Sequence, residues 1–192
     1  MILLIKRLKQ KLLYQFYYKA ILGKSGKKVS LFEPIRIDGG EYISLGDFVS
    51  IQSNGWLYAK NTSNTNAVLS IGEGTVLGYN NHITAIKSVK IGKMVLTANN
   101  VFITDNYHAH EDHLTPIMLQ EVKFKGDVEI GDGSWLGENV CVMGVKIGKN
   151  CVIGANSVVT KDIPDYSIAV GSPARIIKQY SEVEKQWKAI PR

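Results

Sequence analysis

From residue 43 onward, aliphatic side chains recur at every sixth position, often with glycine directly after them. A period of six fits neither the 3.6-residue repeat of a helix nor the two-residue repeat of an ordinary strand. It fits a prism of short strands in which each hexad forms one face and its aliphatic residue points to the axis. Five sets of three share this pattern: Leu45, Ile51 and Leu57; Ile71, Leu77 and Ile83; Ile91, Thr97 and Ile103; Ile130, Leu136 and Val142; Ile147, Ile153 and Val159. Because one three-faced coil has no core of its own, the coils must stack into an all-β solenoid. A β-sandwich with glycine turns would not align five such sets.

The spacing of the sets locates two insertions. The sets begin at residues 45, 71, 91, 130 and 147, so the spacings are 26, 20, 39 and 17 residues. The polar run AKNTSNTNA at 59–67 accounts for the first long spacing, and an extended loop at 104–129 accounts for the second. Long excursions from a regular repeat are more often functional than decorative. The extended loop contains TDNYHAHEDH, with three of the four histidines of the chain.

The two ends of the chain differ from the repeat region. Residues 1–28 carry eight Lys or Arg and no acid, and Ile5, Leu8, Leu12 and Phe16 form one apolar stripe, which predicts a basic amphipathic helix. It packs on the protein body or a neighbouring subunit, or rests on an anionic membrane. Residues 29–178 form the solenoid. Residues 179–192 begin with a capping-box pattern, Ser181 followed by Glu184, which predicts a short C-terminal helix.

Charge and apolar content exclude several classes of protein. The charge outside residues 1–28 is nearly balanced, so the basic face of a nucleic-acid-binding protein is not expected. Two cysteines, Cys141 and Cys151, make no disulfide framework and are expected to fill the core. MILLIKRLKQ is too short for a signal peptide, and no run approaches the roughly 20 apolar residues of a membrane span. We expect a cytoplasmic protein, at the inner face of the membrane if the helix binds lipid.

The segment IGDGSWLGENVCVMGVKIGKNCVIGANSVVTKDIPDYSIAVGSPARII resembles the hexapeptide-repeat acyltransferases, in their maltose, galactoside and polysaccharide O-acetyltransferase branch. The resemblance covers about residues 30–178, and it rests on the repeat, the loop position and the VVTKDIP…GSPAR ending together. It implies a left-handed parallel β-helix of about five or more coils. It also implies a homotrimer that binds acetyl-coenzyme A (acetyl-CoA) between subunits. One departure is VMGVKIG, which lacks the family's usual proline before the glycine.

In that family a loop leaving the third coil carries the catalytic histidine, and the matching position is His108. A neutral imidazole can take the proton of a sugar hydroxyl as the C–O bond forms. The thioester is already activated, so direct transfer in a ternary complex is expected. Asp105 is the preferred group to orient the imidazole, with Glu111, Asp112 or a backbone carbonyl as alternatives.

The resemblance also assigns residues to the two substrates. The acceptor would contact Asn80. Asn81 and His82 are alternatives, because the register between this sequence and the family pattern slips by one or two residues at that point. His110 would contact the acceptor from the loop. The expected acetyl-CoA residues are Trp135, Ala155, Thr160, Lys161 and Arg175. Cations suit the phosphates of that ligand.

The predicted function is acetyl-CoA-dependent O-acetylation of a sugar or polysaccharide precursor. One alternative is N-acetylation of an amino sugar. The other is a non-catalytic or zinc-binding, carbonic-anhydrase-like solenoid with His82, His108 and His113 as ligands. His82 lies 26 residues before His108, which is not a whole number of 18-residue coils, so no metal is expected.

Overall fold

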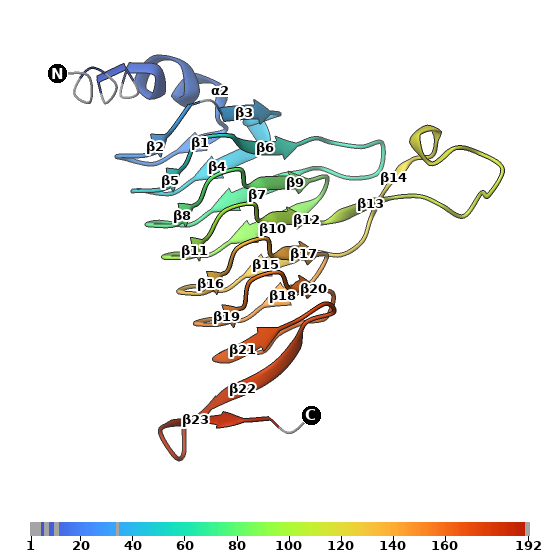
Figure 1. Ribbon diagram of the computed structural model, residues 1–192. Coiled ribbons are helices and arrows are strands. Elements are labelled where there is room, and N and C mark those ends of the chain that lie inside the picture. The colour runs from blue at the N-terminus through green and yellow to red at the C-terminus, as the bar shows by residue number, and fades with distance from the viewer. Residues whose placement is uncertain (1–4, 6–7, 10–11, 34, 191–192) are drawn as a thin grey trace.

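The computed structural model describes residues 5, 8–9, 12–33 and 35–190, the side chain of Gln15 apart. Figure 1 shows a stack of coils with a helix at its N-terminal end, an arm projecting from its side and a hairpin at its C-terminal end. Each coil contributes one strand to each of three parallel sheets, named here the first, second and third faces. The chain is a left-handed parallel β-helix.

The strands of the three faces follow one another in regular rotation. The first face contains β1 (Lys24–Ser25), β4 (Ile43–Leu45), β7 (Val68–Ile71), β10 (Ser88–Ile91), β15 (Val128–Ile130) and β18 (Lys146–Ile147). The second contains β2 (Ser30–Leu31), β5 (Ser50–Ile51), β8 (Val76–Leu77), β11 (Leu96–Thr97), β16 (Trp135–Leu136), β19 (Val152–Ile153) and β21 (Ser167–Val170). The third contains β3 (Ile35–Asp38), β6 (Gly55–Ala59), β9 (His82–Ala85), β12 (Phe102–Thr104), β17 (Cys141–Met143) and β20 (Val158–Val159). Six complete coils therefore lie within the described residues.

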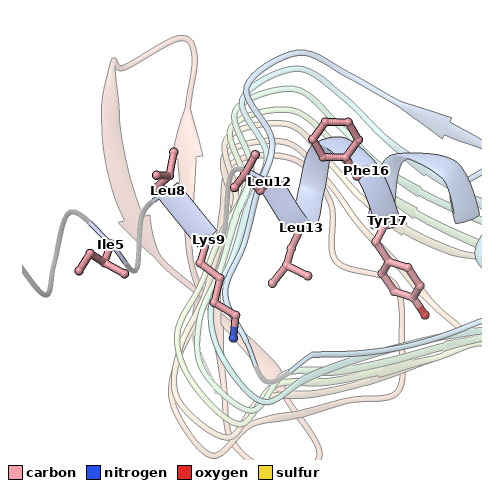
Figure 2. A pocket seen from close by; sticks show the side chains of 7 residues that line it. All are labelled: Ile5, Leu8, Lys9, Leu12, Leu13, Phe16 and Tyr17. Atoms are coloured by element: carbon pink, nitrogen blue, oxygen red, sulfur yellow. The ribbon is translucent and has the colours of Figure 1, made fainter.

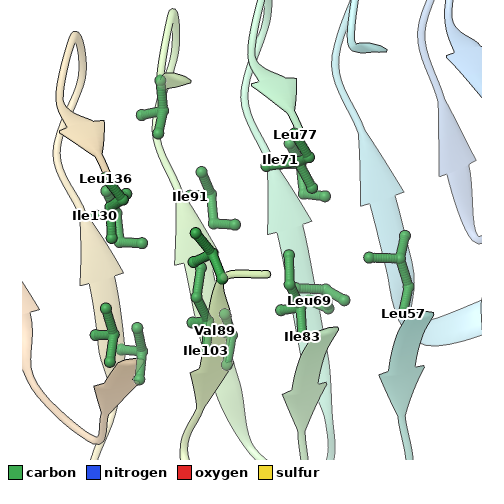
Figure 3. Close-up of a cluster of buried hydrophobic side chains, with 14 of the residues drawn as sticks. Leu57, Leu69, Ile71, Leu77, Ile83, Val89, Ile91, Ile103, Ile130 and Leu136 are labelled. Carbon is green, nitrogen blue, oxygen red and sulfur yellow. The ribbon is translucent and has the colours of Figure 1, made fainter. Parts of the chain in front are cut away.

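The predicted inward positions form the core. All fifteen residues of the five sets are buried. Equivalent positions stack in register, as in the column Ile71, Ile91 and Ile130 on the first face. Figure 3 shows such side chains converging from different faces. The six-residue period thus predicted the core correctly. It missed a coil, because β1 begins at Lys24 with Ser25 in the inward register beside Leu45.

Asparagines at the corners hold successive coils together. Asn54, Asn80 and Asn100 have φ between 57° and 63°, a left-handed conformation that asparagine tolerates better than most residues. The Asn54 Nδ2 donates to Asn80 Oδ1 at 3.0 Å, and the Asn80 Nδ2 donates to Asn100 Oδ1 at 3.0 Å. Asn100 in turn donates to Glu138 at 2.9 Å. The ladder fixes one edge of the stack.

The N-terminal helix is present in the described residues and contains a π-helical turn, η1 (Tyr14–Tyr18), followed by α2 (Lys19–Ile21). Its packed face is made of Tyr14, Tyr18 and Leu22, which are buried. The Tyr18 hydroxyl donates to Glu33 Oε1 at 3.1 Å, and burial beside this carboxylate raises the pKa of Tyr18 to about 12. The predicted stripe of Ile5, Leu8, Leu12 and Phe16 is a different, exposed face. The helix also ends before residue 28, because the chain turns into β1.

The predicted C-terminal helix is wrong. β22 (Arg175–Ser181) runs antiparallel to β21, and β23 (Gln186–Ala189) pairs with β22 in a hairpin. The Glu184 N–H does donate to Ser181 Oγ at 3.2 Å, as in a capping box. However, Lys185 has φ of 52°, so the backbone leaves the helical conformation and turns back. Tyr180 and Trp187 pack edge to face across the hairpin, with centroids 5.6 Å apart.

Candidate active site

The loop after the third face is an ordered arm. β13 (Asn106–His108) pairs antiparallel with β14 (Val122–Phe124), and His108 lies opposite Val122. The Lys125 N–H donates to Asp105 O at 2.7 Å at the base of the arm. A short 3₁₀ turn, η3 (Ile117–Leu119), lies near the tip. The arm therefore holds His108 on a paired strand instead of a free loop.

Asp105 anchors this arm to the solenoid. The residue is fully buried, and its carboxylate accepts hydrogen bonds from the backbone N–H groups of Ile86, Lys87 and Ser88 at 2.8–3.1 Å. It also accepts from Asn106 Nδ2 at 2.9 Å. None of these bonds involves His108, so the prediction that Asp105 orients the imidazole gains no support from these contacts. The chain is extended after Asp105, and residues three apart in an extended chain point to opposite sides.

The imidazole of His108 is exposed. Within the described part of the chain, no hydrogen bond or ion pair is made to its ring. Glu111 is held by Lys123 at 3.1 Å, and this ammonium lowers the pKa of Glu111 to about 2. Asp112 accepts from Thr115 Oγ1 at 2.6 Å. The three carboxylates proposed as orienting partners are thus all occupied elsewhere.

Side-chain alternation places His108 relative to the third face. Asn106 and His108 are two apart on β13 and lie on the same side of the strand. The Asn106 Nδ2 lies 3.3 Å from Thr84 Oγ1 on the third face. The side of the arm that carries His108 therefore faces the outer surface of the third face. His110 is farther along the exposed part of the arm, with its ring 5.9 Å from that of Tyr107.

His82 lies on the outer surface of the third face, near the base of the arm. Its ring stacks on Trp56 at 4.1 Å and lies 5.1 Å from Phe102, both in adjacent strands. Arg36 covers the other face of Trp56 at 4.3 Å. Burial, and secondarily the Arg36 charge, lower the pKa of His82, and its Nε2 is buried without a hydrogen-bond partner in the described structure. The sequence did not reveal this aromatic column, because its members are far apart in the chain.

Asn80 and Asn81 form hydrogen bonds that stabilise the corner of the coil. Asn80 is part of the ladder described above. Asn81 is buried, its Nδ2 donates to Thr97 Oγ1, and its Oδ1 accepts from Val101 N–H at 2.7 Å. A signal for the ladder existed in the sequence. Asn54, Asn80, Asn100, Asn139 and Asn156 repeat at 26, 20, 39 and 17 residues, the same spacings as the aliphatic sets. The expected acceptor contacts of both residues therefore gain no support from the geometry.

The residues expected to meet acetyl-CoA all lie in the C-terminal coils and are exposed. Trp135 begins β16 on the second face and is 45% exposed, and Ala155 follows β19 at the corner between the second and third faces. Thr160 and Lys161 follow β20 at the next corner, beyond the third face. Arg175 begins β22, opposite Val170. The set is divided between two parts of the prism surface, and this geometry does not by itself require a ligand there.

Two further observations concern metal and membrane. Among the residues that the structure describes, no group of three His, Cys, Asp or Glu side chains is close enough to hold a metal ion. None of the described helices has the length and apolar content needed to cross a bilayer. Cys151 is buried in the core, as predicted, whereas Cys141 is half-buried and alternates with the inward Val142, so the prediction that it fills the core is wrong. Burial raises the pKa of both thiols.

A parallel prism of hexads with a histidine-bearing arm defines a class of protein, and comparisons with known proteins agree. The family model described as "Hexapeptide repeat of succinyl-transferase" matches residues 68–105 and 127–161. The galactoside O-acetyltransferase of Escherichia coli is 30% identical over 80% of this chain and 75% of its own. The chain belongs to the hexapeptide-repeat acyltransferases, in the branch of the maltose, galactoside and polysaccharide O-acetyltransferases.

Other relatives are matched over only part of their own length. A protein named as an acetyltransferase of Mycobacterium tuberculosis is 36% identical over 88% of the chain and 51% of its own length. A protein of E. coli named for lipopolysaccharide biosynthesis O-acetyl transfer is 42% identical over 56% of the chain and 58% of its own. The chain thus spans about half the length of these relatives. Among solved structures, a maltose O-acetyltransferase from Clostridium difficile is 28% identical, with a TM-score of 0.60 over 94% of this chain and 89% of that one.

Proposed function

We propose that the protein transfers an acetyl group from acetyl-CoA to a hydroxyl of a sugar or polysaccharide precursor. The observation that carries the proposal is the exposed imidazole of His108, held on an anchored arm in a chain whose relatives are named as sugar O-acetyltransferases. Several solved structures that share this fold are complexes with coenzyme A or acetyl-CoA.

His108 acts as the general base in this proposal. Its neutral imidazole accepts the proton of the attacking hydroxyl while the hydroxyl oxygen bonds to the thioester carbonyl carbon. Collapse of the tetrahedral intermediate breaks the C–S bond, and the imidazolium returns the proton to the departing thiolate. The acceptor lies between the arm and the outer surface of the third face. No enzyme nucleophile is needed, because the thioester is already reactive.

The site is completed by a neighbouring subunit of a homotrimer in this proposal. The carboxylates nearest to His108 in sequence already have other partners, so the group that orients the imidazole is a backbone carbonyl or comes from another chain. The division of the expected acetyl-CoA residues between two parts of the prism surface agrees with a ligand that lies in a groove shared by two subunits. Trp135 and Ala155 would meet the pantetheine arm, and Thr160, Lys161 and Arg175 the arm and the phosphates.

Substitution of His108 tests the proposal. Acetyl-CoA-dependent transfer to sugar and amino-sugar acceptors is measured for the natural chain, for His108→Ala and for His110→Ala as the matched control on the same arm. Loss of a general base lowers the rate by roughly 10²- to 10⁴-fold. We expect that loss only in His108→Ala, with acetyl-CoA binding unchanged. Near-native transfer by His108→Ala would rule out the base, and a preference for amino sugars would move the assignment to N-acetylation.

A further inference from the structure

The N-terminal helix has two apolar faces, and only one of them is used within the chain. The face with Tyr14, Tyr18 and Leu22 packs on the first coil. The other presents Ile5, Leu8, Leu12 and Phe16, which are 59%, 58%, 48% and 76% exposed. Four large side chains in a row on one helix form a continuous patch, and patches of this kind mark interaction surfaces.

The position of this patch limits what can cover it. Figure 1 shows the helix at the end of the stack, and Figure 2, in which the coils lie one behind another, shows it crossing that end. Ile5, Leu8, Leu12, Leu13 and Phe16 border a shallow groove here. A second copy of the chain that lies beside the first, with the two prism axes parallel, contacts the faces and corners of the stack. Such a copy leaves the end of the stack uncovered. The covering partner therefore approaches along the axis of the prism.

Charge favours an anionic partner. Residues 1–28 carry eight Lys or Arg and no Asp or Glu, whereas the other residues carry 15 basic and 17 acidic side chains. Among the described residues of this segment, Lys9, Lys19, Lys24, Lys27 and Lys28 are all exposed. At the same end, Glu33 is partly neutralised by Lys9 at 3.4 Å and Asp38 by Arg36 at 2.7 Å. Basic residues flanking an apolar helix face are typical of segments that lie in the interface of an anionic bilayer.

We propose that the exposed face of the N-terminal helix docks on the surface of an anionic lipid bilayer, with Ile5, Leu8, Leu12 and Phe16 inserted among the lipids. The exposed lysines in the described part of residues 1–28 contact the headgroups. The prism axis then points away from the bilayer surface, and the arm with His108 remains in water near the membrane. In a trimer of parallel prisms the three helices would lie on one surface and bind together. The inference does not depend on the acetyl transfer proposed above.

Co-sedimentation of the full chain with lipid vesicles tests this inference. Vesicles of phosphatidylcholine mixed with phosphatidylglycerol are compared with vesicles of phosphatidylcholine alone. We expect binding at least about ten-fold tighter to the anionic vesicles, and release in about 0.5 M salt. Equal binding to both vesicles, or binding to neither, would overturn the proposal.

A variant pair separates the helix from the rest of the surface. Leu8→Gln/Phe16→Gln removes apolar area without changing the charge, and Val183→Gln alters an even more exposed apolar residue in the hairpin at the other end. We expect the double variant to bind anionic vesicles at least about ten-fold less and Val183→Gln to bind as the natural chain does. Phe16→Gln alone replaces the double variant if that variant fails to fold. If the helix variants bound anionic vesicles as tightly as the natural chain does, the proposal would be contradicted. It would also be contradicted if the natural chain self-associated and the helix variants did not, because a second copy would then cover the face.

Discussion

At the scale of single residues, Asp105 contributes to the site through the backbone it holds. Its buried carboxylate joins the start of the arm to the 86–88 turn of the preceding coil through three backbone N–H groups. Asp105→Asn keeps the size but loses the charge and places an amide donor among these donors. Because hydrogen bonds to charged groups contribute about 1.5–3 kcal/mol, we expect the free energy of unfolding to fall by about 2–4 kcal/mol, measured by urea unfolding. Asp127→Asn, at the exposed end of the same insertion, is the control. An unchanged midpoint in Asp105→Asn would contradict this role.

His82 gives the protein a component of pH-dependent stability. Its pKa is lowered in the folded chain by burial and by Arg36, so folding favours the neutral ring. The unfolded chain binds the extra proton first as the pH falls. This contribution is therefore complete above the unfolded pKa of about 6.5 and is lost as the pH drops below it. We expect His82→Phe, which keeps a stacking ring, to flatten the fall in unfolding free energy between about pH 7 and 5. Parallel pH curves for the two proteins would contradict the expectation.

At the scale of elements, the asparagine ladder decides between two roles for Asn80. If Asn80 only stabilises the corner of the coil, Asn80→Gly keeps a residue that adopts the left-handed backbone easily and loses only the side-chain hydrogen bonds. Asn80→Ala loses those hydrogen bonds and also disfavours the left-handed backbone. A left-handed conformation costs a residue with Cβ about 1–2 kcal/mol, so we expect Asn80→Ala to be less stable than Asn80→Gly by about that amount. The KM for the acceptor should be unchanged in Asn80→Gly. A large rise in that KM at unchanged stability would restore Asn80 as a substrate contact.

The elements also show how far the sequence predicted the structure. The aliphatic period specified the solenoid and its core, because an inward position in a narrow prism accepts only a few side chains. It missed the first coil, since Ser25 occupies an inward position. Local patterns were less reliable at the ends. The apolar stripe Ile5, Leu8, Leu12 and Phe16 was real but was not the packed face, and Ser181 with Glu184 formed a turn of a hairpin.

Only part of the candidate site could be predicted from the sequence, and the reason is physical. The position of the arm followed from the interrupted period, and the resemblance selected His108 within it. The partners of Asp105 lie 17–19 residues away in the preceding coil, and the stacked rings around His82 come from three different coils. Such contacts depend on the exact register between coils, which insertions of unequal length hide in the sequence.

At the scale of the whole molecule, a shared site predicts complementation between subunits. His108 is on the arm beyond the third face, and Ala155 is at the corner before that face. His108→Ala chains and Ala155→Trp chains should each be inactive, the latter because a bulky ring blocks the pantetheine arm. If one site takes His108 and Ala155 from different chains, mixed trimers regain up to about a quarter of natural activity per site. Re-equilibrated mixtures measure this, and unmixed preparations combined at the time of assay are the control. Mixed trimers without activity would assign both residues to one chain.

The most direct test of the central claim is calorimetric titration of acetyl-CoA into metal-stripped protein, with the mass of the assembly measured on the same sample. The account predicts one site per subunit in a trimer, a dissociation constant on the order of micromolar, and weaker binding by Lys161→Ala. Binding by a monomer would contradict the shared groove. No binding of acetyl-CoA, with zinc bound instead, would contradict the acetyltransferase assignment.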